Sequence, residues 1–461
     1  MALKRMLTAV GRGLRIRGVF VACSVLGACG GSGGISGSGG ASAVSGGSEA
    51  SGGAATGGSG PGVGGLVGGA NGGTLSSGGA PLTGGGGASN SGGLPSGLSG
   101  GGPNGSGGGS TGGVANVGGS ASSMPSFFLG ADISSVQESN ASFIDTDGQT
   151  KSVFAVLKNH GFNAVRLRTF VDPLAPYGYA SSENECTGKA EAYGDKAHVI
   201  AYAKQAKAEG MAVLLDFHYS DTWADPGNQI IPSAWRNASS IDALAALMKA
   251  YTRDVLETAI AEGARPDMVQ VGNEITPGVM AHVPSSQTDC WGNNPGVAPI
   301  GGSSSNWKNL GTLLKAGIAA VREVDPNILI MLHTENTDDL NGVKWWVENA
   351  KDQGLDFDVF GLSCYTAFQG APSVWKNTFE QLASAHSDLK FVIAEYNPER
   401  TEANQVMKGL AGGVGLGSFF WEPTQSGEWG SALFTYENGA FRANAEDFAE
   451  FDALRESLGL D

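Results

Sequence analysis

The first quarter of this sequence almost lacks charged and large apolar side chains. From about Gly30 to Ser123 it consists mainly of Gly, Ser, Ala and Asn, with Glu49 as its single acidic residue. Such a composition buries too little apolar surface to offset the entropy of ordering the chain. We therefore predict a disordered Gly/Ser-rich tether over residues 29–125 and one folded domain over residues 126–461, where the composition becomes ordinary.

Basic residues are also scarce. The 28 Lys and Arg residues face 44 Asp and Glu residues, which gives a formal net charge of −16. The first 30 residues are basic and the following tract is nearly neutral, so the negative charge belongs to the folded domain. An acidic surface repels nucleic-acid backbones and anionic lipid headgroups, and we expect neither as a partner. We expect the domain to be a monomer.

An apolar run near the N-terminus is too short to span a bilayer. It extends from Val19 to Ala28 after several basic residues, which is typical of an export signal. The run ends in Leu26-Gly27-Ala28-Cys29, which resembles the lipobox of bacterial lipoproteins. We predict a signal peptide over residues 1–28 and lipidation of Cys29. The protein is then a cell-surface or outer-membrane lipoprotein of a bacterium, held to the membrane only by its lipid. The alternative is an ordinary signal with a chance cysteine and a secreted product.

Cysteine is rare, with five residues in the whole chain. The predicted folded domain contains Cys186, Cys290 and Cys364, and no pair has CxxC spacing, so the sequence gives no support for a structural zinc site. Cys364 lies in an apolar run and is predicted to be buried and unpaired. Cys186 and Cys290 lie in Gly/Asn-rich loops of an exported protein and form a possible disulfide.

Short apolar runs alternate with helical patterns along the folded domain. The predicted strands are 127–131, 164–170, 211–217, 268–272, 328–333, 357–364, 391–395 and 414–421. The predicted helices are 151–160, 196–209, 241–262, 307–323, 342–353, 373–387, 401–410 and 444–458. No glycine-rich phosphate loop follows the first strand, which disfavours an open nucleotide-binding sheet. Eight strand and helix units predict an α/β fold of the (β/α)8 TIM barrel type.

Polar and aromatic side chains gather where the predicted strands end. In a barrel of parallel strands, these ends meet at one face and line the active site. The predicted residues of this face are Asp132, Arg166, Arg168, Asp216, His218, Asp221, Asn273, Glu274, His333, Asn336, Tyr365, Glu395, Trp421 and Glu422.

Two of these residues are glutamates presented from opposite sides of the barrel. Glu274 follows Asn273 at the end of the fourth strand, and Glu395 ends the seventh. Facing carboxyl groups are the machinery of glycoside hydrolysis. A glutamate close to Arg166 would be held ionised and suited to attack. A glutamate beside Asn273, with less charge compensation, would keep its proton for the leaving oxygen.

Several longer motifs carry a family resemblance. They are Gly130-Ala-Asp-Ile-Ser, Val165-Arg-Leu-Arg168, the run from Leu215 to Pro226, Val271-Gly-Asn-Glu-Ile275, Met331-Leu-His333 and Trp421-Glu-Pro423. Together they resemble the endo-β-1,4-galactanases of glycoside hydrolase family 53, clan A, over essentially all of residues 127–461. The most specific part is the segment DFHYSDTWADPG, because the GNE triplet is shared across the clan.

The resemblance implies a retaining mechanism, with Glu274 as general acid/base and Glu395 as nucleophile. It also implies that Arg166 orients and ionises Glu395 and that Asn273 binds the sugar 2-hydroxyl. The residues implied for the floor of the subsite at the cleaved bond are His218, Tyr365 and Trp421. The implied substrate is galactan or type I arabinogalactan of plant cell-wall pectin.

Further binding positions and alternatives follow from the same residues. Trp223 and Trp291 offer aromatic faces for flanking sugars, although loop packing explains them equally well. We expect no cofactor and no metal. Tyr396-Asn397-Pro398 and the residue Cys364 depart from the family pattern near the expected cut site, which leaves mannan or glucan as alternative substrates. A non-catalytic surface protein that binds carbohydrate is a further alternative.

Overall fold

The computed structural model describes residues 124–182, 192–289 and 292–460. The export signal, Cys29 and most of the predicted tether lie outside this range, as do Cys186, Cys290 and Trp291. Within the described residues, no helix is both long enough and apolar enough to cross a membrane.

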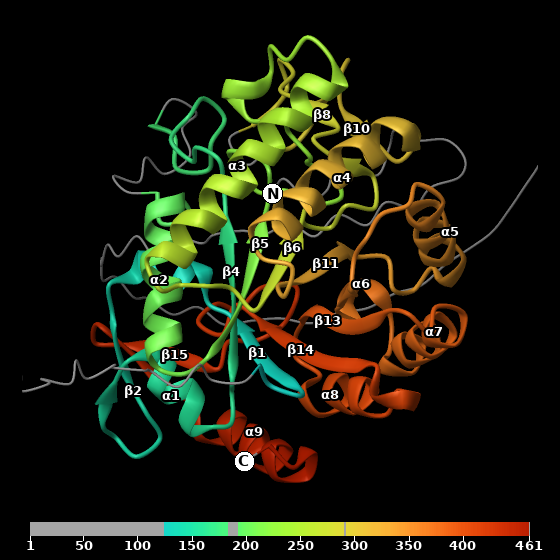
Figure 1. Ribbon diagram of the computed structural model, residues 1–461. Coiled ribbons are helices and arrows are strands. Elements are labelled where there is room, and N and C mark those ends of the chain that lie inside the picture. Colours follow the sequence, from blue (N-terminus) through green and yellow to red (C-terminus); the bar gives the residue numbers. More distant parts are fainter. Residues whose placement is uncertain (1–123, 183–191, 290–291, 461) are drawn as a thin grey trace, which may run out of the picture. The chain divides into compact units, whose positions relative to one another are not determined.

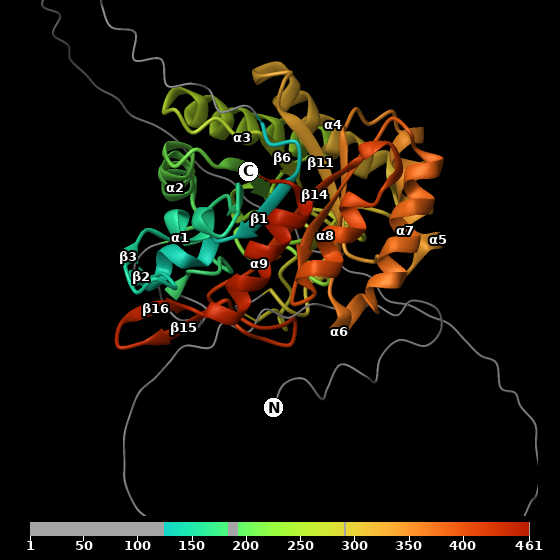
Figure 2. The ribbon, with the colours of Figure 1, turned by 90° about the horizontal axis from the view of Figure 1, so that it is seen from below.

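Eight parallel strands close into a barrel, with helices around it (Figures 1 and 2). The strands are β1 (Phe128–Asp132), β4 (Ala164–Thr169), β5 (Ala212–Phe217), β6 (Met268–Val271), β11 (Leu329–Thr334), β12 (Val359–Cys364), β13 (Lys390–Tyr396) and β14 (Gly415–Trp421). Each is hydrogen-bonded to its neighbours in the order β1-β14-β13-β12-β11-β6-β5-β4, and β4 pairs with β1 to close the ring. The predicted TIM barrel is therefore confirmed.

The helices that alternate with these strands cover the outside of the barrel. They are α1 (Val153–Asn159), α2 (Lys196–Ala208), α3 (Ile241–Ala261), α4 (Trp307–Val324), α5 (Leu340–Asp352), α6 (Thr366–Gln369), α7 (Pro372–Ala385), α8 (Arg400–Lys408) and α9 (Ala445–Leu458). Their starts follow from local chemistry, since Ser152, Asp195 and Ser240 each accept a hydrogen bond from a backbone N–H of the first turn. Every predicted helix is present, and α6 is additional.

Among the residues that the structure describes, three small sheets lie outside the barrel, and they were not predicted. The largest orders its strands as β15-β16-β2-β3, from β2 (Ser142–Ile144), β3 (Thr150–Lys151), β15 (Phe434–Glu437) and β16 (Ala440–Ala443). The other two pair β7 (Gly278–Val279) with β10 (Gly302–Ser303) and β8 (His282–Val283) with β9 (Gly296–Val297). These strands are too short for the period-two pattern that marks a strand in sequence.

The barrel strands bury both faces, which explains their nearly continuous apolar sequences. On β4, Val165 and Leu167 belong to the core between strands and helices, whereas Ala164 packs in the barrel interior. The interior core receives a side chain from every barrel strand, namely Phe128, Ala164, Ala212, Leu214, Met268, Met331, Val359, Val392, Ala394 and Phe419. The lower barrel is therefore filled, and polar side chains are left to its upper end.

The C-terminal helix α9 contacts the region around α1, near the start of the barrel. His160, which follows α1, lies between Asp145 and Asp452, with ring nitrogens 2.9 Å and 3.0 Å from their carboxylate oxygens. Figures 1 and 2 both place α9 beside α1. The two ends of the described domain are thus joined away from the strand ends that carry the polar residues.

Barrel closure allows one stability prediction at Gly417. This residue pairs with Phe128, has φ +126°, and a Cβ built on it would lie 2.0 Å from the Phe128 carbonyl oxygen. Replacing it with alanine adds steric overlap to backbone strain, so we expect Gly417→Ala to lower the free energy of unfolding by at least ~3 kcal/mol. Denaturant titration of the purified domain measures this loss.

Gly413 provides the matched control. It also has a positive φ, +63°, but no atom lies within 4 Å of its Cβ position. Gly413→Ala should lower the free energy of unfolding by only ~1 kcal/mol, the strain of the left-handed conformation. Equal losses in the two variants would contradict the steric explanation.

Candidate active site

A buried arginine organises the polar end of the barrel. Arg166 on β4 is fully buried, two residues beyond Ala164 on the inward face. Its guanidinium reaches acceptor atoms of five residues, Asp132, Asp216, Gln270, Asn273 and Glu395, at 2.7–3.2 Å. Burial disfavours the charged form of Arg166, but the surrounding carboxylates outweigh this effect and raise its pKa. Arg166 is therefore a permanent cation at the centre of the site.

Glu395 is directed into the barrel by an irregularity in β13. Its neighbour Ala394 also packs inside, so strict alternation would place Glu395 outside. The register between β12 and β13 passes from Leu362–Ile393 to Ser363–Glu395, which leaves Ala394 as an extra residue. This bulge turns the carboxylate towards the polar end of the barrel.

The surroundings of Glu395 both raise and lower its pKa. Burial raises the pKa to about 7, against the charge of Arg166 and a hydrogen bond from Tyr365. Glu395 Oε1 lies 2.9 Å from Arg166 Nη1, and the Tyr365 hydroxyl donates to Oε2 over 2.9 Å. Without these two contacts, burial alone would hold the proton to still higher pH.

Glu274 sits on a strained turn just after β6. Its φ is +47°, in the left-handed region, and Gly272 before it has φ +92°. Its Oε1 accepts a hydrogen bond of 2.8 Å from Ser363, whose hydroxyl lies 2.9 Å from His333 Nε2. A non-glycine residue held in this conformation is strained, which is common at functional sites.

The pKa of Glu274 is raised well above its ordinary value of 4.5. Burial is the largest cause, and the charges of Glu395 and Glu335 raise the pKa further, whereas the hydrogen bond from Ser363 lowers it. No cation touches the Glu274 carboxyl among the described contacts of this domain. The two glutamates therefore differ: Glu395 has direct charge compensation and Glu274 does not.

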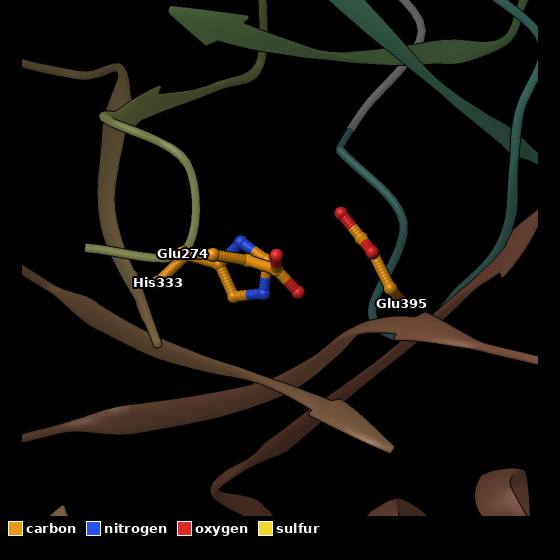
Figure 3. Close-up of side chains that lie close together, drawn as sticks. All are labelled: Glu274, His333 and Glu395. Carbon is orange, nitrogen blue, oxygen red and sulfur yellow. The ribbon is translucent and has the colours of Figure 1, made fainter. Parts of the chain in front are cut away.

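The two carboxyl groups face each other across the barrel (Figure 3). One oxygen of Glu274, one oxygen of Glu395 and one ring nitrogen of His333 all lie within 4.8 Å of one another. Such a separation is near the ~5–5.5 Å of a nucleophile and acid/base pair and shorter than the ~6.5–9.5 Å that admits an attacking water. It is the geometry of double displacement with retention.

The same three residues have the composition of a small metal site, but their hydrogen bonds disfavour it. His333 Nδ1 lies 3.0 Å from Asn273 Oδ1, and Nε2 lies 2.9 Å from the Ser363 hydroxyl. Arg166 already contacts Glu395. A metal ion would have to displace the histidine contacts and approach a guanidinium at close range.

Aromatic rings form one wall of the site. Trp421 packs with Tyr365 and Trp429, and half-buried Trp223 packs against the same group. The Trp223 and Trp421 ring centroids are 6.3 Å apart with an interplanar angle of 70°. His218 lies 5.9 Å from Trp223, edge to face. The sequence prediction named four of these residues and did not include Trp429, which lies on the loop after β14.

The remaining predicted binding residues are largely engaged within the protein. His218 Nδ1 accepts from the Ala224 backbone N–H at 3.0 Å, and its Nε2 lies 3.1 Å from Asp216. Asn273 donates to the Ala224 carbonyl. Asp221 accepts from the backbone N–H groups of Asp172 and Ser233, and burial raises its pKa to about 6. Asp221 thus holds together the chain segments around Asp172 and Ser233, near the site.

Other polar residues join the site without having been predicted as binding residues. Gln270 connects Arg166 to Asn273, Ser363 holds Glu274, and Glu335 accepts a hydrogen bond from Thr276 and has its pKa raised to about 7 by burial. Gln270 and Ser363 are polar residues at inward positions of apolar strands. This pattern in the sequence could have predicted that both belong to the site. Glu335 continues the alternation of Met331 and His333, but it lies beyond the predicted strand 328–333.

The packing prediction for Cys364 is confirmed, since this cysteine is buried and free. On α5, Trp346 is fully buried and Trp345 is 49% exposed, as is usual for a helix with one inner face.

Comparison with known proteins agrees with this geometry. The profile of glycosyl hydrolase family 53 matches residues 128–408. An endo-β-1,4-galactanase of Bacillus subtilis is 32% identical over 331 residues, which cover 64% of this chain and 70% of the relative. An arabinogalactan endo-β-1,4-galactanase of Thermothelomyces thermophilus is 30% identical over 335 residues, covering 64% and 89%. The catalytic domain from Ignisphaera aggregans, of the same family, superposes with a TM-score of 0.59 at 27% identity, covering 72% of this chain and 97% of that domain.

The raised pKa of Glu274 predicts a pH-dependent effect on stability. Above pH 4.5 the unfolded chain releases this proton while the folded protein retains it, so the stability that Glu274 contributes falls as pH rises. Glutamine cannot ionise and can still accept from Ser363. Glu274→Gln should therefore match the wild-type melting temperature at pH 4 and exceed it by at least ~2 °C at pH 8.

Calorimetry at the two pH values tests this expectation. Glu456→Gln, on the exposed face of α9, serves as the control and should change the melting temperature equally at both. A Glu274→Gln variant that is no more stable at pH 8 than at pH 4, relative to wild type, would contradict a proton held on Glu274.

Proposed function

Because the chain belongs to glycosyl hydrolase family 53, we propose that it is an endo-acting enzyme that hydrolyses β-1,4-galactosidic bonds of galactan with retention of configuration. The observation that carries the mechanism is the facing pair of Glu274 and Glu395 with unequal surroundings. Both carboxyl groups are buried. Glu395 has the cation of Arg166 beside it, whereas Glu274 has no cation in contact.

The first step transfers the sugar to the protein. The Glu395 carboxylate attacks the anomeric carbon, and Glu274 gives its proton to the glycosidic oxygen as the bond to the leaving chain breaks. Arg166 and Tyr365 hold the two oxygens of Glu395 in place for attack. The products are a glycosyl ester on Glu395 and a shortened polysaccharide with a new hydroxyl.

In the second step the same two residues act, and Glu274 now serves as a base instead of an acid. Ester formation removes the negative charge of Glu395, which is one cause of the raised pKa of Glu274. The pKa of Glu274 therefore falls in the intermediate, and its carboxylate takes a proton from water. That water attacks the anomeric carbon and releases Glu395 as a carboxylate, with two inversions giving net retention.

The aromatic wall suits a pyranose substrate. Trp421 and Tyr365 pack together beside Glu395, and flat aromatic rings at this place suit the apolar side of a sugar ring. The indole nitrogens of Trp223, Trp421 and Trp429 are buried and make no hydrogen bond among the described residues. Buried N–H groups without a partner favour a polar ligand beside this wall.

The alternatives are less well supported. Mannan and glucan are disfavoured by the match to family 53 and by the galactanases among its relatives. A binding protein without catalysis has no need for two facing carboxyl groups beside a buried cation, since both impose a desolvation penalty on the fold.

The position of the enzyme in the cell is a further part of the proposal. Residues 1–28 have the pattern of an export signal, and Cys29 completes a lipobox-like sequence. We propose that the mature protein is a surface lipoprotein, or a secreted monomer if Cys29 is not modified, that acts on plant cell-wall polysaccharide.

The catalytic assignment predicts different defects for the two glutamates. Glu395→Gln should lose at least ~10⁴-fold in kcat on β-1,4-galactan, because an amide cannot form the glycosyl ester. Glu274→Ala should lose ~10³-fold on galactan, where the leaving oxygen needs a proton. On a dinitrophenyl β-galactobioside, whose leaving group needs no proton, Glu274→Ala should still release dinitrophenol in a rapid burst.

Product analysis of wild-type digests of galactan, mannan and β-glucan provides the control for substrate. Release of galacto-oligosaccharides from galactan alone is expected. An equal defect of Glu274→Ala on galactan and on the dinitrophenyl substrate would contradict its role as acid, and activity in Glu395→Gln would contradict the nucleophile.

Lipidation is tested separately by Cys29→Ser. In a bacterial host with lipoprotein processing, the wild-type enzyme should partition into the detergent phase and incorporate labelled palmitate, because acyl chains bind the bilayer. Cys29→Ser should do neither and should retain galactanase activity. Label incorporation by the Cys29→Ser variant would refute the predicted site.

A further inference from the structure

A second buried arginine lies above Arg166 and takes no part in the proposed proton transfers. Arg168 is two residues further along β4, on the same inward face, and is 1% exposed. Its Nη2 lies 2.5 Å from Glu422 and 3.5 Å from Asp132. Arg166, and not Arg168, makes the ion pair with Glu395.

The guanidinium of Arg168 lies against two indole rings. Its central carbon is 4.2 Å from the centroid of Trp223 and 4.6 Å from that of Trp421. Its Nε and Nη1 are buried and make no hydrogen bond among the described residues. For these two nitrogens the aromatic faces replace the oxygen acceptors that a buried guanidinium normally requires.

The two indoles come from different parts of the chain. Trp223 lies on the loop after β5, where it packs against Phe170 and Tyr179, and Trp421 ends β14 in the group with Tyr365. Arg168 contacts both rings and is anchored at its other edge by Glu422. Trp223 and Trp421 also meet edge to face, and Arg168 adds a second contact between them by lying against both rings.

We propose that Arg168 is a positioning residue that fixes the relative orientation of Trp223 and Trp421, and so the shape of the sugar-binding wall. Arg168 acts on substrate binding through the two indoles and leaves the proton chemistry to Glu274 and Glu395. The part of this inference that concerns sugar binding rests on the proposed function, whereas the orientation of the rings does not.

We call the contact of Arg168 with Trp223 and Trp421 the clamp. Its chemistry requires arginine. A planar guanidinium can stack on two ring faces while one edge pairs with a carboxylate. Lysine keeps the positive charge and can still approach Glu422, but its compact, strongly hydrated ammonium cannot stack on both indoles. Arg168→Lys therefore separates the loss of stacking from the loss of charge.

The experiment compares Arg168→Lys, Trp223→Phe and the double variant. Arg168→Lys should raise KM for galactan about 10-fold, with kcat within about 3-fold of wild type, as expected when a cation–π clamp on the binding wall is lost. The pH profile of kcat should not move. In the Trp223→Phe background the same change should raise KM less, because the two residues act through one contact.

A second measurement needs no substrate. The near-UV circular dichroism of the free enzyme should change in Arg168→Lys, since the Trp223 and Trp421 rings lose their fixed orientation. Arg236→Lys is the matched control, because Arg236 is a partly buried arginine whose guanidinium lies 5.6 Å from the Tyr177 ring centroid. It should leave both KM and the tryptophan bands unchanged.

The outcomes separate the two levels of the proposal. An unchanged tryptophan spectrum in folded Arg168→Lys overturns the clamp, whatever the substrate is. A changed spectrum with unchanged KM overturns the link to sugar binding, and a fall in kcat with a shifted pH profile assigns Arg168 to the chemistry instead. Failure of wild-type enzyme to cut galactan refutes the proposed function but leaves the spectroscopic test of the clamp valid.

Discussion

The buried guanidinium of Arg166 is the interaction on which the site depends. Three carboxylates, Asp132, Asp216 and Glu395, lie 2.8–2.9 Å from it, and none of them is open to bulk solvent. Burial raises the pKa of Glu395, and the guanidinium of Arg166 opposes that effect by direct contact. Glu395 therefore loses its proton before Glu274, which has no cation beside it. The placement of one charge therefore decides which of the two glutamates keeps its proton to higher pH.

Two departures from regular backbone bring that pair together. The extra residue Ala394 in β13 reverses the direction in which Glu395 would otherwise point. After β6, the left-handed turn at Glu274 likewise redirects a side chain towards the site. Both irregularities occur where the strands leave the filled lower barrel. Hydrogen bonds from Tyr365 and Ser363 then hold the carboxylates at their final positions. The strain is confined to the ends of strands, where the rest of the barrel can support it.

The barrel thus separates stability from function along its axis. Its lower interior is closed by apolar side chains such as Phe128 and Phe419, whose rings stack with centroids 6.0 Å apart. Its upper end contains charged groups whose burial opposes folding unless each finds a partner. Arg166 forms ion pairs with Asp132, Asp216 and Glu395. Two residues further along β4, Arg168 pairs with Glu422 and lies against the indole ring of Trp223. The arginine that contacts Glu395 and the arginine that contacts the two indoles are thus both on β4, two residues apart.

The sequence by itself determined the barrel, because eight apolar runs separated by capped helices have few other ways to be buried, and it placed Glu274 and Glu395 at facing strand ends. It also indicated the cation, since Arg166 interrupts an apolar strand. Only the tertiary structure decided which way each side chain points. The bulge at Ala394 breaks the alternation from which direction is inferred, and the contacts of Ser363 and Trp429 join segments far apart in the chain. The pKa values depend on burial and on charges brought close by folding, and neither is a property of local sequence.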